Sequence, residues 1–216
     1  MDTENRILRI GIDGRWEASE FSQSLASFDR LYALRFGLAL EKQELDELRE
    51  LDFDYPFSRA LRSSRSFRRW ARTSPLNLIL GQRTNLVIDG RISDLTSELL
   101  EPDERLVVQR IIYGSPGIKD LVGFGEIIGH LKDFIQFGVE HWSSRRKRSL
   151  EDDRLELENK KLQIEIAKGF VDVADSLGYS AQEKRQLVAA VVYEQKPLIQ
   201  LISDGKIVSA EIVEES

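Results

Sequence analysis

The feature that most constrains this 216-residue chain is the placement of three strand-like segments at its beginning, middle and end. Residues 6–12 (RILRIGI) and 206–213 (KIVSAEIV) place apolar side chains on one face, and residues 104–113 (ERLVVQRIIY) are rich in β-branched residues. A strand is not stable alone in water, so each segment needs the other two. We therefore expect an α+β protein with one small sheet that unites the N- and C-terminal strands and is covered by helices.

A long helix is predicted in the second half of the chain. The run GSPG (114–117) looks like a helix opening, with Ser115 as N-cap and Pro116 at the first helical position. Three glycines weaken the first turns, so the firm helix is expected from about residue 126 to residue 177 and to end at Gly178. At 1.5 Å per residue it would be about 75 Å long.

A second helix is predicted to fold back beside this one. SAQE (180–183) is a capping box that opens a helix over residues 181–202. We expect the resulting helical hairpin to project from the body as an arm. The predicted organisation is therefore an N-terminal α+β body (1–116), a long helix with its hairpin arm (117–203) and a C-terminal strand that returns to the body (204–216).

The end of the long helix has a short coiled-coil pattern. An asparagine at a core position of a coiled coil often sets the register and the number of partners. The pattern lasts about three heptads, and packing against helix 181–202 of the same chain explains it as well as a dimer does. We favour self-association, with a homo-oligomer or another protein as partner, because so long a helix needs cover along its length. The predicted interface consists of Leu155, Asn159, Leu162, Ile166 and Val173.

The composition argues against several classes of protein. A net charge of −6 and a pI near 5.2 give no general attraction to nucleic acid or to an anionic membrane. No window of about 18 residues is free of charge, and the N-terminus lacks the pattern of a signal peptide. The absence of cysteine excludes disulfides and thiolate metal sites, and we expect a cytoplasmic protein.

Two basic patches are the candidates for partner binding. The first is a predicted amphipathic helix over residues 58–72, whose pattern is typical of helices that bind membrane surfaces or nucleic acid. The acidic segment 41–54 precedes it and would neutralise it if the chain folded back at Pro56, which we favour. Membrane and nucleic-acid partners therefore remain the alternatives. The residues concerned are Arg59, Arg62, Arg65, Arg68, Arg69 and Arg72, and in the second patch Arg145, Arg146, Lys147 and Arg148.

Few residues point to chemistry. His130 and His141 share a face of the long helix, and Glu126, four residues before His130, could place two ligands side by side. A metal site needs three or four convergent ligands, and the sequence marks no third. We therefore expect neither a metal nor another cofactor. Free backbone N–H groups at a helix start can hold an anion, so Ser115 and Gly117 are a candidate anion site.

The runs YGSPGIKDLVGFGEIIGHLKDFI, RRKRSLEDDRLELENKKLQIEIA and LGYS resemble those of bacterial proteins that share this layout of a long helix followed by a coil. The resemblance covers roughly the C-terminal half of the chain and, less clearly, IDGRWEASEFSQSLASFDRLYAL. It implies a bacterial origin. It supplies no catalytic residues.

Three functions follow from these patterns. The first is a non-enzymatic interaction or assembly protein that associates through its long helix. The second is a peripheral membrane or nucleic-acid binder that uses the two basic patches. The third is an enzyme whose site is built from dispersed acids and arginines. We favour the first, because the sequence contains no recognisable catalytic constellation.

Overall fold

The computed structural model describes residues 4–51, 100, 102–145, 164, 167–179 and 181–214. Residues 167–176 are helical, and a short 3-10 helix, η2, spans Pro102–Glu104. The other elements, in chain order, are β1 (Asn5–Ile12), α1 (Ala18–Leu51), β2 (Val107–Ile112), β3 (Gly117–Phe124), α6 (Gly125–Arg145), α8 (Ala181–Ser203) and β4 (Ile207–Val213).

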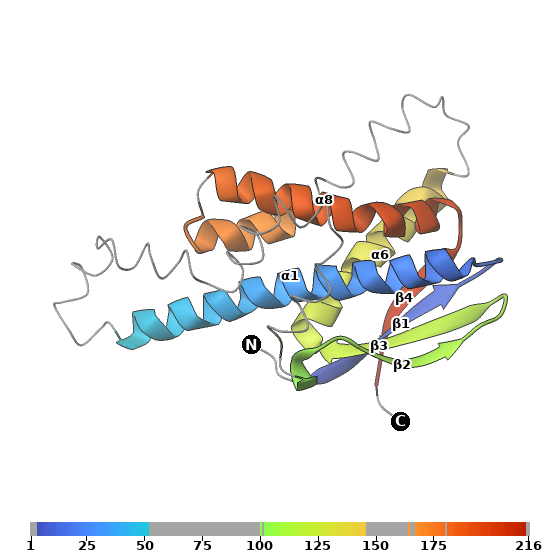
Figure 1. Cartoon of the computed structure of the whole chain (residues 1–216), viewed down its shortest axis with the longest axis horizontal. Coiled ribbons are helices and arrows are strands. Elements are labelled where there is room, and N and C mark those ends of the chain that lie inside the picture. The colour runs from blue at the N-terminus through green and yellow to red at the C-terminus, as the bar shows by residue number, and fades with distance from the viewer. Residues whose placement is uncertain are drawn as a thin grey trace.

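The predicted α+β fold and the sheet that unites the two ends of the chain are confirmed. The four strands are antiparallel in the order β2-β3-β1-β4, so N-terminal β1 pairs with C-terminal β4 (Figure 1). Helices cover one face of this sheet. The side chains of Leu8, Ile10 and Ile12 point from β1 to that face and are fully buried in the core.

The helix opening predicted at Ser115 is wrong. Residues 114–116 form the turn that joins β2 to β3, with a cis peptide bond between Ser115 and Pro116. The residues predicted as the first helical turns form β3, and α6 begins only at Gly125. The physical reason is that β3 lies between β1 and β2, and this pairing on both sides satisfies its backbone groups.

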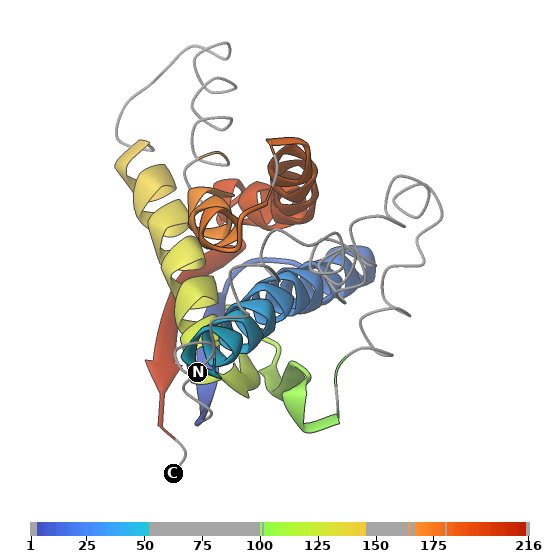
Figure 2. The same cartoon turned by 90° about the vertical axis from the view of Figure 1, so that its left-hand side faces the viewer.

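The single helix predicted over residues 126–177 is also wrong. A straight helix would place residue 170 about 60 Å from residue 130. Instead, His130 of α6 and Phe170 line one cavity. Helix 167–176 therefore runs beside the start of α6, and Figure 2 shows that the two helices have different directions.

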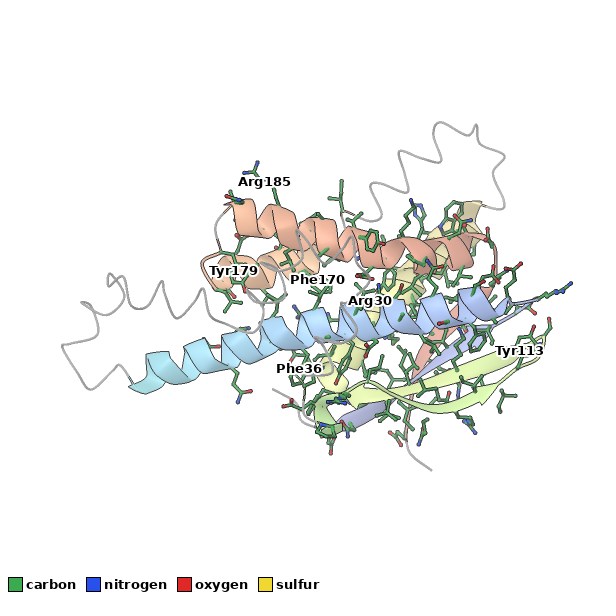
Figure 3. All side chains as sticks on the ribbon, viewed as in Figure 1. Arg30, Phe36, Tyr113, Phe170, Tyr179 and Arg185 are labelled. Carbon is green, nitrogen blue, oxygen red and sulfur yellow. The ribbon has the colours of Figure 1, made fainter. Side chains whose placement is uncertain are left out.

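The helical hairpin is confirmed, but it does not project from the body. Gly178 has a positive φ of 78°, and the N–H of Tyr179 donates to the carbonyl of Ala174 at 3.0 Å, so helix 167–176 ends at the predicted C-cap. Phe170 and Ala174 are buried, as are Leu187, Val191 and Leu198 of α8. Exposing these apolar faces to water would destabilise the protein. They pack along α1 instead, in the same core as the sheet (Figure 3).

Candidate functional site

The first candidate is the face of the sheet that the described helices leave open. Residues that pair directly across antiparallel strands point to the same face. The register places Arg9 opposite both Asp120 and Glu211, and Asp120 opposite Arg110. Arg9 lies between Leu8 and Ile10 in the strand, so its side chain points away from the core. One row of alternating charge, Glu211–Arg9–Asp120–Arg110, therefore crosses all four strands; it is called the charged row below.

Asp120 fixes the centre of the charged row. Its carboxylate accepts hydrogen bonds from Nε and Nη2 of Arg9 at 2.9 and 3.1 Å, and from Nε and Nη2 of Arg110 at 2.9 and 2.6 Å. Only 1% of the Asp120 side chain is exposed, against 29% for Arg9 and 49% for Arg110. Burial by itself raises the pKa of Asp120, but the hydrogen bonds from the two arginines outweigh it and lower that pKa. Asp120 therefore stays charged at neutral pH.

Apolar side chains flank the charged row on both sides. Val107 and Ile112 of β2 are each 50% exposed, and they pair with Val122 and Ile118 of β3. On β1, Ile7 continues the row of Val107 and Val122, and β4 adds Val213. The open face therefore has an apolar, charged and apolar band in succession. Exposed apolar side chains such as those of Val107 and Ile112 are typical of a surface that another protein covers.

The second candidate is a cavity of about 320 Å³ between α1, α6, helix 167–176 and α8. Its wall is mostly apolar. Four polar side chains interrupt it, those of Arg35, His130, Asp133 and Gln195. The apolar lining residues include Leu31, Ile127, Leu131, Phe134, Phe137 and Phe170.

Arg35 is the cation of this cavity, and only 8% of it is exposed. Its Nη2 donates to Nε2 of His130 at 2.6 Å, and a Glu126 carboxylate oxygen lies 3.8 Å away. An arginine nitrogen only donates, so His130 accepts through a neutral Nε2. Burial, and after it the charge of Arg35, lower the pKa of His130 and favour this neutral form.

Gln195 gives the cavity unused hydrogen-bonding capacity. It is fully buried, and neither its amide nitrogen nor its amide oxygen has a hydrogen-bond partner among the described residues. The same holds for Nε of Arg35. A buried polar group without a partner costs about 1–3 kcal/mol of stability. Two of the residues that line the cavity thus carry unpaired polar atoms.

A third unusual group is Lys119, which is fully buried under the sheet. Its Nζ lies 3.8 Å from the ring centroids of both Trp16 and Phe21 and donates to the hydroxyl of Ser24 at 2.8 Å. Burial lowers the pKa of Lys119 to about 7. The ammonium group is enclosed by the protein's own rings, so this lysine acts on stability and is not aimed at a ligand.

The anion site predicted at Ser115 and Gly117 loses its basis. The free N–H groups of a helix start are not there, because Ser115 lies in the β2–β3 turn and Gly117 begins β3. The Ser115 hydroxyl instead donates to the carboxylate of Asp13. This hydrogen bond lowers the pKa of Asp13, and the resulting negative charge opposes a bound anion.

The other predicted site residues lie mostly outside the described part of the chain. Val173 is described, and it packs against the protein's own core, which agrees with the alternative of packing within one chain. Arg145 is the last residue of α6. The residues outside are Leu155, Asn159, Leu162 and Ile166 of the predicted interface, Arg59, Arg62, Arg65, Arg68, Arg69 and Arg72 of the first basic patch, and Arg146, Lys147 and Arg148 of the second.

The charged row and Arg35 were missed in the sequence. A signal for the row was available, because Arg9 and Arg110 stand in the middle of segments predicted as strands. Asp120 was hidden by its assignment to a helix. Nothing in the sequence marked Arg35 and Gln195 as site residues, because a single polar residue on an apolar helix is common. Only the packing of the helices brings the two residues to one cavity.

Comparison of the chain with family models, with curated proteins and with solved structures finds no match. Among the described residues, no group of three or more histidines, cysteines and acids is placed to hold a metal ion. None of the described helices combines the length and the apolar character needed to cross a membrane. The open sheet face and the cavity are therefore the features of the described residues that bear on function.

Proposed function

We propose that this protein is a non-enzymatic interaction and assembly protein that self-associates through the open face of its sheet. The single observation that carries the proposal is the charged row, which reads negative, positive, negative, positive from β4 to β2. The sequence pattern favoured the long helix as the interface. The described helices bury most of their apolar residues in their own core, and on β2 the exposed Val107 and Ile112 lie on the open face.

The charged row is complementary to a second copy of itself. A two-fold axis that runs parallel to the strands, between two stacked sheets, reverses the row. Glu211 then faces Arg110 of the second copy, and Arg9 faces Asp120. A two-fold axis along the row would place like charges opposite each other, so the charges select one of the two arrangements.

The apolar bands support the same arrangement. An axis parallel to the strands keeps each band at its own height, so Val107 of one copy meets Val213 of the other. Two stacked sheets are usually rotated by about 30° because each is twisted. At the ends of a row of four strands this rotation shifts the charges by only about 4 Å, which long arginine side chains can bridge.

The size of the face predicts a weak dimer. Four strands about 4.8 Å apart and seven residues at about 3.3 Å give roughly 440 Å² per copy. Two copies would bury about 900 Å², below the 1,200–2,000 Å² or so of stable complexes. We therefore expect a dissociation constant of tens to hundreds of micromolar, on the order of −5 to −6 kcal/mol.

Sedimentation equilibrium from about 5 µM to 1 mM tests the proposal, because this range brackets the expected dissociation constant. The wild-type chain should shift from monomer to dimer across it. Val107→Asp should stay monomeric, since it places a charge in the apolar band. Tyr193→Asp is the matched control, because Tyr193 is 53% exposed on α8, away from the sheet.

A charge variant tests the selected axis. Glu211→Lys should weaken the dimer at least tenfold, because it places a lysine opposite Arg110 of the second copy. Glu140→Lys makes the same change at an exposed position of α6 and should not affect the dimer. Circular dichroism confirms that each variant is folded. A wild-type monomer at 1 mM, or a Val107→Asp variant that dimerises like the wild type, contradicts the proposal.

A further inference from the structure

The cavity between α1, α6, helix 167–176 and α8 has a polar group and an apolar group of residues, and this division indicates the kind of molecule that fits. We propose that it binds a small amphiphilic monocarboxylate, with the carboxylate at Arg35 and Gln195 and the apolar body among the phenylalanine and leucine side chains. This inference does not depend on self-association, because the cavity lies on the helix side of the sheet.

The polar part of the cavity matches a carboxylate. Nε of Arg35 and the amide nitrogen of Gln195 are buried donors without partners among the described residues. A carboxylate has only acceptor oxygens, so it can take both donors at once. The guanidinium group is already oriented by its hydrogen bond to Nε2 of His130, which lowers the entropy cost of binding.

The charge around the cavity favours a single negative charge. Arg35 is the one cation among the described lining residues. Glu126 lies 3.8 Å from its Nη2, and the exposed Asp133 also belongs to the wall and pairs with Lys132 at 3.1 Å. These acids leave too little positive potential for a phosphate dianion, whereas a monocarboxylate needs only one arginine.

The apolar part limits the size of the ligand. The remaining described wall consists mainly of apolar side chains of α1, α6 and helix 167–176, among them Leu31, Phe134 and Phe170. Figure 3 shows Phe170 in the space between the hairpin and α1. A cavity of about 320 Å³ lies at the lower end of the ~300–1,000 Å³ of ligand pockets, so it suits a small ligand. A straight-chain acid of eight carbons has ten non-hydrogen atoms and fits this volume.

A purely structural role explains Gln195 poorly. A leucine of similar volume would fill the same place without leaving two buried polar atoms unpaired. A residue that lowers stability and lines a cavity is typical of a binding site, where function and stability oppose each other. Replacing a binding glutamine should therefore raise stability and weaken ligand binding together, whereas replacing a purely structural glutamine would not weaken binding.

Isothermal titration calorimetry of the full chain with octanoate tests the inference. We expect a dissociation constant between about 10 µM and 1 mM for a ligand of this size. Octanol has the same apolar body without the charge and should bind at least tenfold more weakly. Octanol binding as tightly as octanoate, or no octanoate binding at 5 mM, overturns the proposal.

Two variants locate the site. Gln195→Leu should raise the thermal midpoint and at the same time weaken octanoate at least fivefold. Arg35→Met should weaken octanoate at least tenfold while leaving octanol unchanged, which also shows that the variant is folded. Tyr193→Leu, on the exposed side of α8, is the matched control and should bind octanoate like the wild type. If Gln195→Leu gains stability but binds octanoate as tightly as the wild type, the proposed site is wrong.

Discussion

At the scale of single residues, the burial of Lys119 makes stability depend on pH. Its ammonium group is fully buried between Trp16 and Phe21, with the hydroxyl of Ser24 as its hydrogen-bond acceptor. Burial lowers its pKa from 10.5 to about 7, and the two rings oppose that shift because they stabilise the cation. The unfolded chain therefore binds more protons than the folded protein between these values.

We predict that the free energy of unfolding rises with pH from about pH 7 to pH 9. The folded-state pKa is below the unfolded one, so stability is gained as the lysine loses its proton, by at most about 1.4 kcal/mol per pH unit. Lys119→Met should remove the rise and stabilise the protein by about 1–3 kcal/mol near pH 6. Urea unfolding at several pH values measures this. Lys196→Met, an exposed lysine on α8, should leave the pH profile unchanged.

Arg35 and His130 have an effect of the same sign at lower pH. Protonation of His130 would place two cations 2.6 Å apart, and burial and Arg35 keep its pKa below 6.5. We predict that stability falls as the pH decreases below about 6.5, because only the unfolded chain readily takes up this proton. His130→Gln keeps an acceptor for Arg35 and should reduce the fall in urea unfolding experiments. An identical acid profile for the variant would show that other groups cause it.

At the scale of elements, the boundary between β3 and α6 decides the architecture. Gly123 ends the run of β3 residues on the core face, where an added Cβ atom would lie 2.6 Å from Cε2 of Tyr32. The hydroxyl of Tyr32 accepts a hydrogen bond from the N–H of Phe124 at 3.1 Å, which holds the ring against the strand. Gly129, only six residues further, lies in α6 with open space around it. Two nearby glycines therefore have different physical roles.

We predict that Gly123→Ala and Gly129→Ala have opposite effects. The first forces the ring of Tyr32 to move and should cost about 1–3 kcal/mol. The second replaces a glycine in a helix without a clash and should stabilise the protein by about 0.5–1 kcal/mol. Thermal unfolding of the two variants measures both. Equal effects at the two positions would contradict the placement of this boundary.

At the scale of the whole molecule, the two ends of the chain complete one sheet. β4 pairs with β1 along its length, and Ile207 of β4 is buried in the core against the residues of β1. The body therefore does not fold in the order of the sequence, because β1 at the start needs a strand made about 200 residues later. Contacts of such long range are slow to form.

We predict that removal of residues 206–216 prevents stable folding. The truncation exposes the edge of β1 and opens the core at Leu8 and Ile10, and exposed strand edges aggregate. Circular dichroism and soluble yield measure the loss. A chain that lacks only residues 215–216, which follow β4, should fold like the full chain. A truncated protein that is soluble and unfolds cooperatively would show that the fold does not require β4.

The strands with clear alternation and the helix end at Gly178 were predictable, because they depend on neighbours in the sequence. The β3 segment was not, since Ile118, Leu121 and Phe124 fit a helical spacing as well as a strand. Pairing with β1 and β2 decides in favour of the strand. The long helix was overestimated for a related reason: a helical pattern does not show where the chain turns back.

The sequence by itself determined the α+β class and the sheet that joins the termini, because alternation of apolar residues is a local property and isolated strands need partners. Only the tertiary structure decided which charges stand in one row and which buried polar groups meet. Arg9 is 111 residues from Asp120, and Arg35 is 160 residues from Gln195. Both surfaces proposed to bind a partner or a ligand arise from such distant residues, since strand register and helix packing bring them together.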